Sequence, residues 1–159
     1  MTKTNALRQL DAAGIKYELR QYDFDEDHPC GVQGNLDPTL LEHIFKTLVA
    51  RGERSGIIVF CVPIQAELDM KKCAAASGDK RIEMIHLKEL TGLTGYVRGG
   101  CSPVGMKKRY PIIFDETALL YDEIWISAGQ RGLQMLVNTE ALAAFVDGKF
   151  ADVTRSNGE

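Results

Sequence analysis

A glycine-rich segment at residues 95–111 (GYVRGGCSPVGMKKRYP) has the composition of a ligand-binding loop. Glycine backbone can approach a bound molecule closely because it carries no Cβ, and successive N–H groups in such a loop can hold an anion. Gly100 and Gly105 have the spacing of a phosphate loop, but Met106 stands where that loop requires lysine. The segment therefore predicts a small-ligand site and not a nucleoside-triphosphate site.

Other motifs of catalytic or metal-binding sites do not occur in the sequence. There is no GxGxxG for a dinucleotide and no GxSxG for a hydrolase nucleophile. The four cysteines form no CxxC pair and the three histidines form no HExxH, so their spacing predicts neither a metal nor a dithiol redox site. Scattered cysteines of a reducing compartment are usually buried thiols, which we expect of Cys61 and Cys73.

Three consecutive cations, Lys107, Lys108 and Arg109, follow the glycines of this segment. A run of this kind is most often a solvated face of the protein. Its position after a ligand-type loop supports a second interpretation, contact with the phosphate backbone of a nucleic acid. Because the whole chain is acidic, any such contact must be local.

Lys46 lies in a predicted strand, FKTLV at residues 45–49. Side chains alternate along a strand, so Phe45 and Thr47 share one face while Lys46 and Leu48 share the other. The lysine stem can then pack against apolar neighbours while its ammonium reaches a cleft. There it would donate to a carbonyl or phosphate oxygen. A lysine that simply faces solvent is the alternative.

The composition is that of an ordinary globular protein. The chain has 159 residues, 45% of them hydrophobic and 26% charged, with a net charge of −3. This length suits one domain, residues 1–159, with a core that needs neither disulfides nor metal. No apolar run is long enough for a membrane span, and the first residues lack the apolar core of a secretory signal. We therefore expect a cytoplasmic protein with no membrane partner.

Hydrophobic periodicity predicts a mixture of helices and strands. Helices are expected over residues 4–13, 38–44, 66–76, 88–93 and 139–146, and strands over residues 15–22, 45–49, 57–62, 83–86, 112–114, 123–127 and 133–137. The apolar run IIVFCV at 57–62 is typical of a strand buried on both faces. Short turns join several strands, so strict βαβ alternation is absent. The pattern predicts an α+β fold with a central mixed, barrel-like sheet flanked by helices.

Five short motifs occur in order along the chain: FKTLV at 45–49, AELDMKK at 66–72, GGCSPVGMKK at 99–108, SAGQRG at 127–132 and KFADV at 149–153. Together they resemble the YbaK/EbsC family of aminoacyl-tRNA editing domains, which is related to the insertion domain of bacterial prolyl-tRNA synthetase. The resemblance runs from about residue 5 to residue 153. It implies a single-domain enzyme that releases a wrong amino acid from tRNA in trans, without cofactor or metal.

The resemblance also implies roles for individual residues. Lys46 would be the catalytic residue, positioned at the 3′ end of the tRNA in a pocket beside the glycines of the loop. The implied substrate-binding residues are Tyr22, Gly99, Gly100, Cys101, Ser102, Ser127 and Gly129, and the implied tRNA contacts are Lys107, Lys108 and Arg109. In cysteine-specific members the thiol of the substrate attacks its own ester, so no enzyme nucleophile is required.

The need for such an enzyme follows from the sizes of the amino acids. Cysteine is close to proline in size, and one small apolar difference is worth only about 1–3 kcal/mol to a binding site. A second site must therefore test the product of prolyl-tRNA synthetase. The expected substrate is Cys-tRNA(Pro), with Cys-tRNA(Cys) left open as a second one, and the expected transient protein partner is prolyl-tRNA synthetase.

Two departures from the family pattern leave alternatives open. Cys101 fills the variable position of GGxSP, so a nucleophilic thiol is a rival interpretation. It requires a base, which only the fold could bring from His28, His43 or His86. Gln134 stands where many members have aspartate, so editing of another small amino acid, such as alanine, stays open. A catalytically silent module that binds tRNA or a synthetase is the alternative from a different class.

Overall fold

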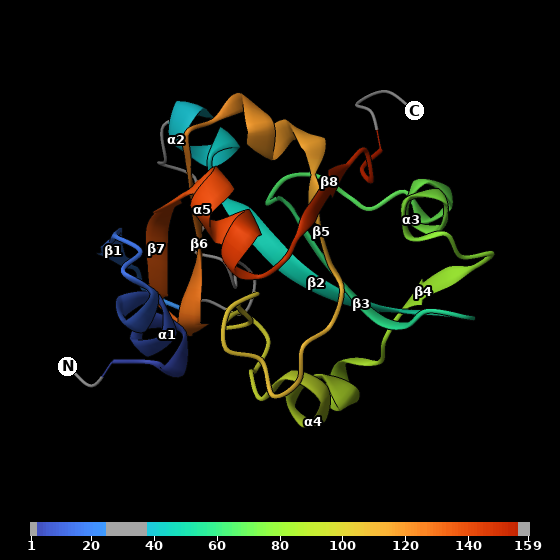
Figure 1. The fold of residues 1–159 in the computed structure, drawn as a ribbon, viewed down its shortest axis with the longest axis horizontal. Coiled ribbons are helices and arrows are strands. Elements are labelled where there is room, and N and C mark those ends of the chain that lie inside the picture. Colours follow the sequence, from blue (N-terminus) through green and yellow to red (C-terminus); the bar gives the residue numbers. More distant parts are fainter. Residues whose placement is uncertain (1–2, 25–37, 156–159) are drawn as a thin grey trace.

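The computed structural model describes residues 3–24 and 38–155, and these form an α+β fold (Figure 1). The helices are α1 (Asn5–Ala13), α2 (Pro38–Glu42), α3 (Met70–Ser77), α4 (Leu90–Thr94) and α5 (Thr139–Phe145), with 3-10 turns η1 (Leu87–Glu89) and η2 (Glu116–Leu120). The strands are β1 (Tyr17–Gln21), β2 (Phe45–Gly52), β3 (Gly56–Pro63), β4 (Ile82–Met84), β5 (Ile112–Asp115), β6 (Glu123–Gln130), β7 (Leu133–Asn138) and β8 (Lys149–Ala151).

The strands form two sheets. One is antiparallel, in the order β1-β7-β6, and the other has five strands in the order β4-β2-β3-β5-β8. In the second sheet β4, β2 and β3 pair antiparallel, whereas β5 and β8 add in parallel. A bridge between Ile44 and Trp125 joins the two sheets. The predicted α+β class with mixed pairing is confirmed, and its strands are divided between two linked sheets rather than one continuous sheet.

Local capping explains where the helices begin and end. Thr4 accepts a hydrogen bond from the Leu7 N–H at the start of α1, and Gly14 ends that helix in the left-handed conformation. The predicted helix at 66–76 begins later, at Met70. Its first residues are used elsewhere, because Leu68 bridges to Thr154 and Asp69 caps α3.

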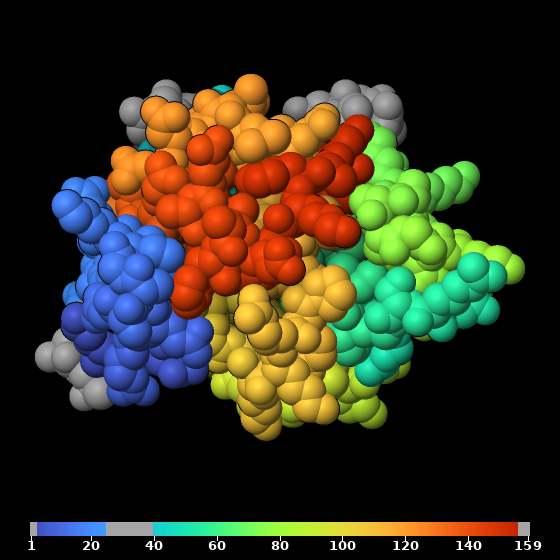
Figure 2. Space-filling view, viewed as in Figure 1, coloured from blue at the N-terminus to red at the C-terminus, as the bar shows by residue number. Residues whose placement is uncertain are grey.

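The central strand β3 is buried on both faces, as its apolar run predicts. Val59 and Cys61 belong to the larger core cluster, while Ile58 and Phe60 belong to the smaller one. Two parallel layers of side chains therefore meet at this strand. In the space-filling view the segment around residues 100–112 covers the surface between α1 and the β2–β3 hairpin (Figure 2).

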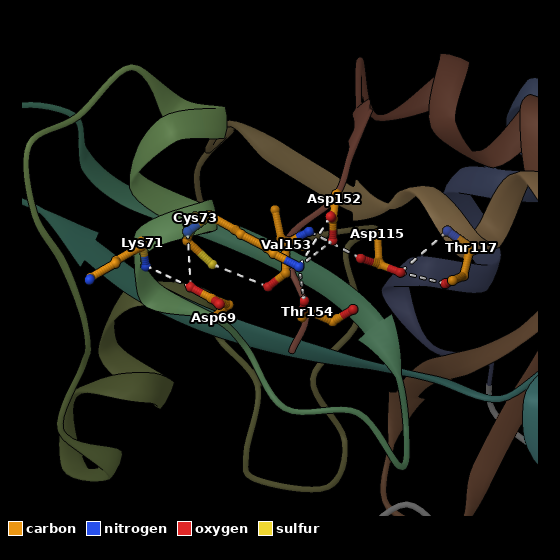
Figure 3. A network of polar contacts seen from close by, with 9 residues as sticks. Asp69, Lys71, Cys73, Asp115, Thr117, Asp152, Val153 and Thr154 are labelled. Atoms are coloured by element: carbon orange, nitrogen blue, oxygen red, sulfur yellow. Dashed lines mark hydrogen bonds and ion pairs between the residues drawn. The ribbon is translucent and has the colours of Figure 1, made fainter. Parts of the chain in front are cut away.

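The end of the described chain is fastened to α3 and β5 by a network of polar contacts (Figure 3). One oxygen of the buried Asp115 carboxylate accepts the Val153 N–H at 3.1 Å, and the other accepts the Thr117 hydroxyl at 2.5 Å. The Val153 carbonyl accepts the Asp69 N–H at 2.9 Å and the Cys73 thiol at 3.7 Å. The short strand β8, which periodicity did not predict, leads into this network.

The described cysteines are buried free thiols, as expected of Cys61 and Cys73. Burial raises the pKa of the Cys61 thiol, and it raises the pKa of the Cys73 thiol to about 12. Cys30 and His28 lie outside the described residues. In the part of the chain that the structure describes, no helix has the length and apolar character of a membrane span.

Candidate functional site

A cavity of about 340 Å³ lies along one edge of β2. β4 pairs with β2 only over Ala50–Gly52, and no other described strand is ladder-paired with that edge over residues 46–49. Segments far apart in the sequence close the space around this edge. The lining residues are Tyr22, Phe45, Lys46, Thr47, Leu48, Val49, Met84, Ile85, Leu87, Leu90, Arg98, Gly99, Cys101, Ser127 and Gln134.

Five of the residues implied as site residues line this one cavity: Tyr22, Lys46, Gly99, Cys101 and Ser127. The Tyr22 hydroxyl donates to the Gly99 carbonyl at 3.5 Å, which joins the segment after β1 to the glycine-rich loop. Gly99 has a φ of 85°, a conformation that disfavours a side chain. The predicted alternation along β2 is also found, since Phe45 and Val49 enter the larger core while Leu48 packs against the smaller one.

Three other implied residues do not line the cavity but shape the loops around it. At Gly100 a Cβ would lie 3.0 Å from the Arg131 backbone nitrogen, so glycine permits close packing against the β6–β7 turn. Ser102 is fully buried, and its hydroxyl accepts the Val104 N–H at 3.2 Å. Gly129 has a φ of 101°, and a Cβ there would lie 3.2 Å from the Tyr96 ring.

The three consecutive cations lie away from this cavity and are exposed. The Lys107 ammonium donates to the Gly92 carbonyl at 3.4 Å. Lys108 and Arg109 line a separate depression, which they share with Phe145 and with residues of the glycine-rich loop. The structure therefore divides the candidate residues into a cavity group and a group on a separate surface.

Three polar residues of the cavity wall, Thr47, Arg98 and Gln134, were not predicted as site residues, although the identity of Gln134 was linked to the amino-acid preference. Arg98 lies inside the glycine-rich segment, directly before Gly99, so its position offered a signal. Gln134 is 2% exposed and accepts a 2.5 Å hydrogen bond from Arg20. Its register opposite Ser127 in the β6–β7 hairpin places both side chains at the same cavity wall. The strands predicted at 123–127 and 133–137 would have indicated this pairing if the turn between them had been known.

The cavity has a cationic and partly apolar character. Lys46 and Arg98 are its charged lining residues, and no carboxylate from the described residues joins them in the wall. The remaining wall is largely aliphatic, with the Thr47, Cys101 and Ser127 side chains adding small polar groups. Such a site suits a compact ligand with an anionic or carbonyl-rich end.

No described histidine lines the cavity beside Cys101. The His43 ring stacks on Tyr121 with ring centroids 4.1 Å apart, and His86 is exposed before the η1 turn. Among the residues with described positions, no three His, Cys, Asp or Glu side chains gather as they would around a metal ion.

Known proteins are similar to this chain in both sequence and fold. The family model of the aminoacyl-tRNA editing domain matches residues 38–145. An Enterococcus faecalis protein named "Putative Cys-tRNA(Pro)/Cys-tRNA(Cys) deacylase EbsC" is 43% identical over 154 residues, which is 96% of this chain and 93% of the relative. The family match, which runs from α2 past β7, includes every residue named above as lining the cavity except Tyr22.

Two crystal structures share the fold. Hypothetical protein APE2540 has a TM-score of 0.79 at 19% identity, over 96% of this chain and 100% of that chain. A "putative trans-editing enzyme for prolyl tRNA synthetase" has a TM-score of 0.74 at 23% identity, over 98% of this chain and 100% of that chain. The family model and the 43% identical relative show that the chain belongs to the family of aminoacyl-tRNA editing domains.

Proposed function

We propose that this protein is a trans-editing deacylase that removes cysteine from Cys-tRNA(Pro), with Cys-tRNA(Cys) as a further substrate. The observation that carries the proposal is the cavity in which Lys46, Gly99, Cys101 and Ser127 meet. Its two cations suit the phosphate and ester oxygens of an aminoacylated 3′ end. The name of the 43% identical relative, a Cys-tRNA(Pro)/Cys-tRNA(Cys) deacylase, supports the same substrate.

The proposed reaction uses the nucleophile of the substrate itself. The cysteine thiol attacks its own ester carbonyl, a carbon–sulfur bond forms and the bond to the ribose oxygen breaks. The thiol proton ends on the ribose hydroxyl, so the products are a cyclic thioester and free tRNA. Serine carries a weaker nucleophile and alanine carries none, so this chemistry selects cysteine even where the cavity admits all three.

Lys46 is the residue to which we assign catalysis. A lysine ammonium in the cavity wall can donate to the ester oxygen or the adjacent phosphate while negative charge develops during attack. Gly99 brings backbone to the wall without a side chain, and Tyr22 closes one side through its hydrogen bond to the Gly99 carbonyl. Ser127 and Gln134 form the opposite wall, against which the amino acid would rest.

The exposed cations provide the proposed contact with the body of the tRNA. Lys107, Lys108 and Arg109 lie outside the cavity, so they would contact backbone phosphates rather than the reacting ester. We also propose a transient complex with prolyl-tRNA synthetase, because mischarged tRNA leaves that enzyme before it can be edited in trans.

Deacylation of purified Cys-tRNA(Pro), Ala-tRNA(Pro), Ser-tRNA(Pro) and Cys-tRNA(Cys) tests the proposed function. We expect Cys-tRNA(Pro) to be deacylated at least about tenfold faster than the alanyl and seryl forms, because the fit in the pocket and the attacking thiol both favour cysteine. Mass spectrometry of the released amino acid during the first turnovers would detect the thioester. Equal rates for alanine and cysteine would overturn the cysteine-specific chemistry, and no hydrolysis of any form would favour the silent binding module.

A further inference from the structure

A second depression opens beside the cavity and shares part of its wall. Like the cavity it has a volume of about 340 Å³, and Leu87, Leu90 and Arg98 line both spaces. Its own lining residues are Phe24, Thr91, Val97 and Arg131. The two spaces are therefore neighbours along one surface, with Arg98 at their boundary.

The walls of the second depression combine exposed apolar groups with guanidinium groups. Leu87 is 60% exposed and Val97 is 43% exposed, so two large apolar side chains of this depression face solvent. The Arg131 guanidinium lies 4.4 Å from the centre of the Phe24 ring. None of the residues lining the depression is acidic. Apolar side chains and an aromatic ring next to arginine can pack against a nucleobase and bind its phosphate.

The two arginines are held close together by the loops that carry them. The Arg131 Nε donates to the Arg98 carbonyl at 2.9 Å, which ties the β6–β7 turn to the glycine-rich loop. Gly100 adds to this contact, since a Cβ there would lie only 3.0 Å from the Arg131 nitrogen. No described carboxylate forms an ion pair with either arginine. Among the described residues, Arg98 therefore offers its guanidinium to an anionic ligand, while Arg131 offers the terminal nitrogens that its contacts with the Arg98 carbonyl and the Phe24 ring leave.

We propose that the second depression binds the nucleotide immediately 5′ to the terminal adenosine of the tRNA substrate. This inference rests on the proposed function, which puts the terminal adenosine and its ester in the cavity. One phosphodiester joins the two nucleotides, and Arg98 lies where that phosphate must cross from one space to the next. The base of the second nucleotide then packs on Leu87 and Val97, beside the Phe24–Arg131 pair.

This subsite accounts for recognition of the tRNA end without reading the amino acid. Stacking accepts any base because every base has an apolar face, and a guanidinium accepts any phosphate. The subsite would therefore add affinity for every tRNA 3′ end equally. Selection of cysteine would be left to the cavity and to the chemistry of the substrate.

Binding of adenosine, adenosine 5′-monophosphate (AMP) and the dinucleotide CpA to the whole protein tests the subsite without any catalysis. We expect CpA to bind about tenfold more tightly than AMP, the scale that one stacked base provides. Val97→Ser should reduce this gap to within about threefold. Arg98→Gln should instead reduce the gap between AMP and adenosine. The controls Leu120→Ser and Arg8→Gln change exposed residues that line neither space and should preserve both gaps.

The outcomes separate the subsite from the proposed function. A wild-type protein that binds CpA no better than AMP, or binds none of the probes at millimolar concentration, overturns the subsite even if it deacylates Cys-tRNA(Pro). A CpA–AMP gap that survives Val97→Ser, or an AMP–adenosine gap that survives Arg98→Gln, also overturns it and would leave the exposed Leu87 and Val97 to a protein partner. Selective binding of CpA without hydrolysis of any aminoacyl-tRNA keeps the subsite and removes the deacylase.

Discussion

The Arg20 guanidinium donates a 2.5 Å hydrogen bond to the side-chain oxygen of Gln134, from β1 to the neighbouring strand β7. Gln134 lines the cavity, whereas Arg20 does not. The contact fixes the direction of a buried amide at the wall against which we place the amino acid of the substrate. Gln134 therefore has the position of a specificity-determining residue, and Arg20 that of a positioning residue.

Replacement of Gln134 should change selectivity more than rate. Gln134→Ala enlarges the cavity and removes the acceptor of Arg20, so we expect discrimination between cysteine and larger amino acids to fall by about tenfold. Arg20→Ala should cause part of the same loss, because it releases the amide without altering the wall directly. Ratios of kcat/KM for a series of aminoacyl-tRNAs measure both effects. If the Gln134 variant were less stable but kept the wild-type kcat/KM ratios, the role of Gln134 would be structural only.

Lys46→Ala should lower deacylation by about 10²–10³-fold, the loss seen when one donor is removed from developing charge. The fold should persist, because Lys46 is only partly buried and its neighbours in β2 keep their places in the two cores. Single-turnover rates and a thermal melt measure the two quantities. Lys16→Ala is the charge-matched control, since Lys16 is exposed and lines no part of the cavity. Near-wild-type turnover of the Lys46 variant would remove it from catalysis.

Cys101→Ala and Cys101→Ser should each retain deacylation within about tenfold of the wild type. The reason is that a nucleophilic thiol requires a base, and neither described histidine lines the cavity with Cys101. A small residue in its place would still fill the wall. If the alanine variant were folded but inactive, the thiol would be the nucleophile, and His28, outside the described residues, would be the first candidate for its base.

The sequence predicted those features that depend on local pattern. The period of residues 45–49 and the run at 57–62 placed β2 and β3 correctly, and the glycines of the loop pointed to the wall of a cavity. Features set by tertiary pairing were harder to predict. Strand β8 has three residues, too few for a periodic signal, and it forms because β5 offers a free edge. The helix begins only at Met70, because Leu68 forms a β-bridge with Thr154 and cannot also be helical.

The same limit explains the mixed outcome for the glycines implied as site residues. A glycine in the sequence indicates that the backbone can closely approach a neighbouring group, but it does not identify that group. At Gly99 the close approach is to the cavity, whereas at Gly100 it is to the Arg131 backbone and at Gly129 to the Tyr96 ring. The distinction depends on which segment packs against each glycine: the β6–β7 turn packs against Gly100, and Tyr96 of the glycine-rich loop packs against Gly129.

The exposed cations should govern tRNA affinity and its dependence on salt. Lys108→Gln and Arg109→Gln remove charges that lie outside the cavity, so the chemical step should be unaffected. We expect each to raise KM for full-length tRNA and to reduce the slope of log affinity against log salt by about one. A short substrate that ends at the terminal nucleotides should be hydrolysed as by the wild type. An unchanged salt slope would make this segment a solvated face only.

The Asp79 carboxylate joins the turn of the β2–β3 hairpin to the segment after α3, accepting hydrogen bonds from the Arg54 and Ser55 backbone N–H groups and from the Ser55 hydroxyl. Desolvation opposes ionisation of this group, but these hydrogen bonds outweigh it and hold the pKa of Asp79 well below its usual range. The hairpin includes β2, the strand along which the cavity lies. The Asp79 contact therefore affects the site only by stabilising the hairpin.

Because the pKa of Asp79 is lower in the folded state than in the unfolded chain, the unfolded chain takes up the proton first as pH falls. The stabilisation is complete above the unfolded value of about 4 and is lost as pH falls below it. Asp79→Asn should therefore lower the melting temperature at pH 7, with a difference from wild type that shrinks steadily from pH 5 to pH 2. Glu53→Gln, in the same turn but without a described hydrogen bond to its carboxylate, is the matched control. Thermal melts across this pH range measure the effect, and a difference that stays constant with pH would show that the Asp79 charge contributes nothing to stability.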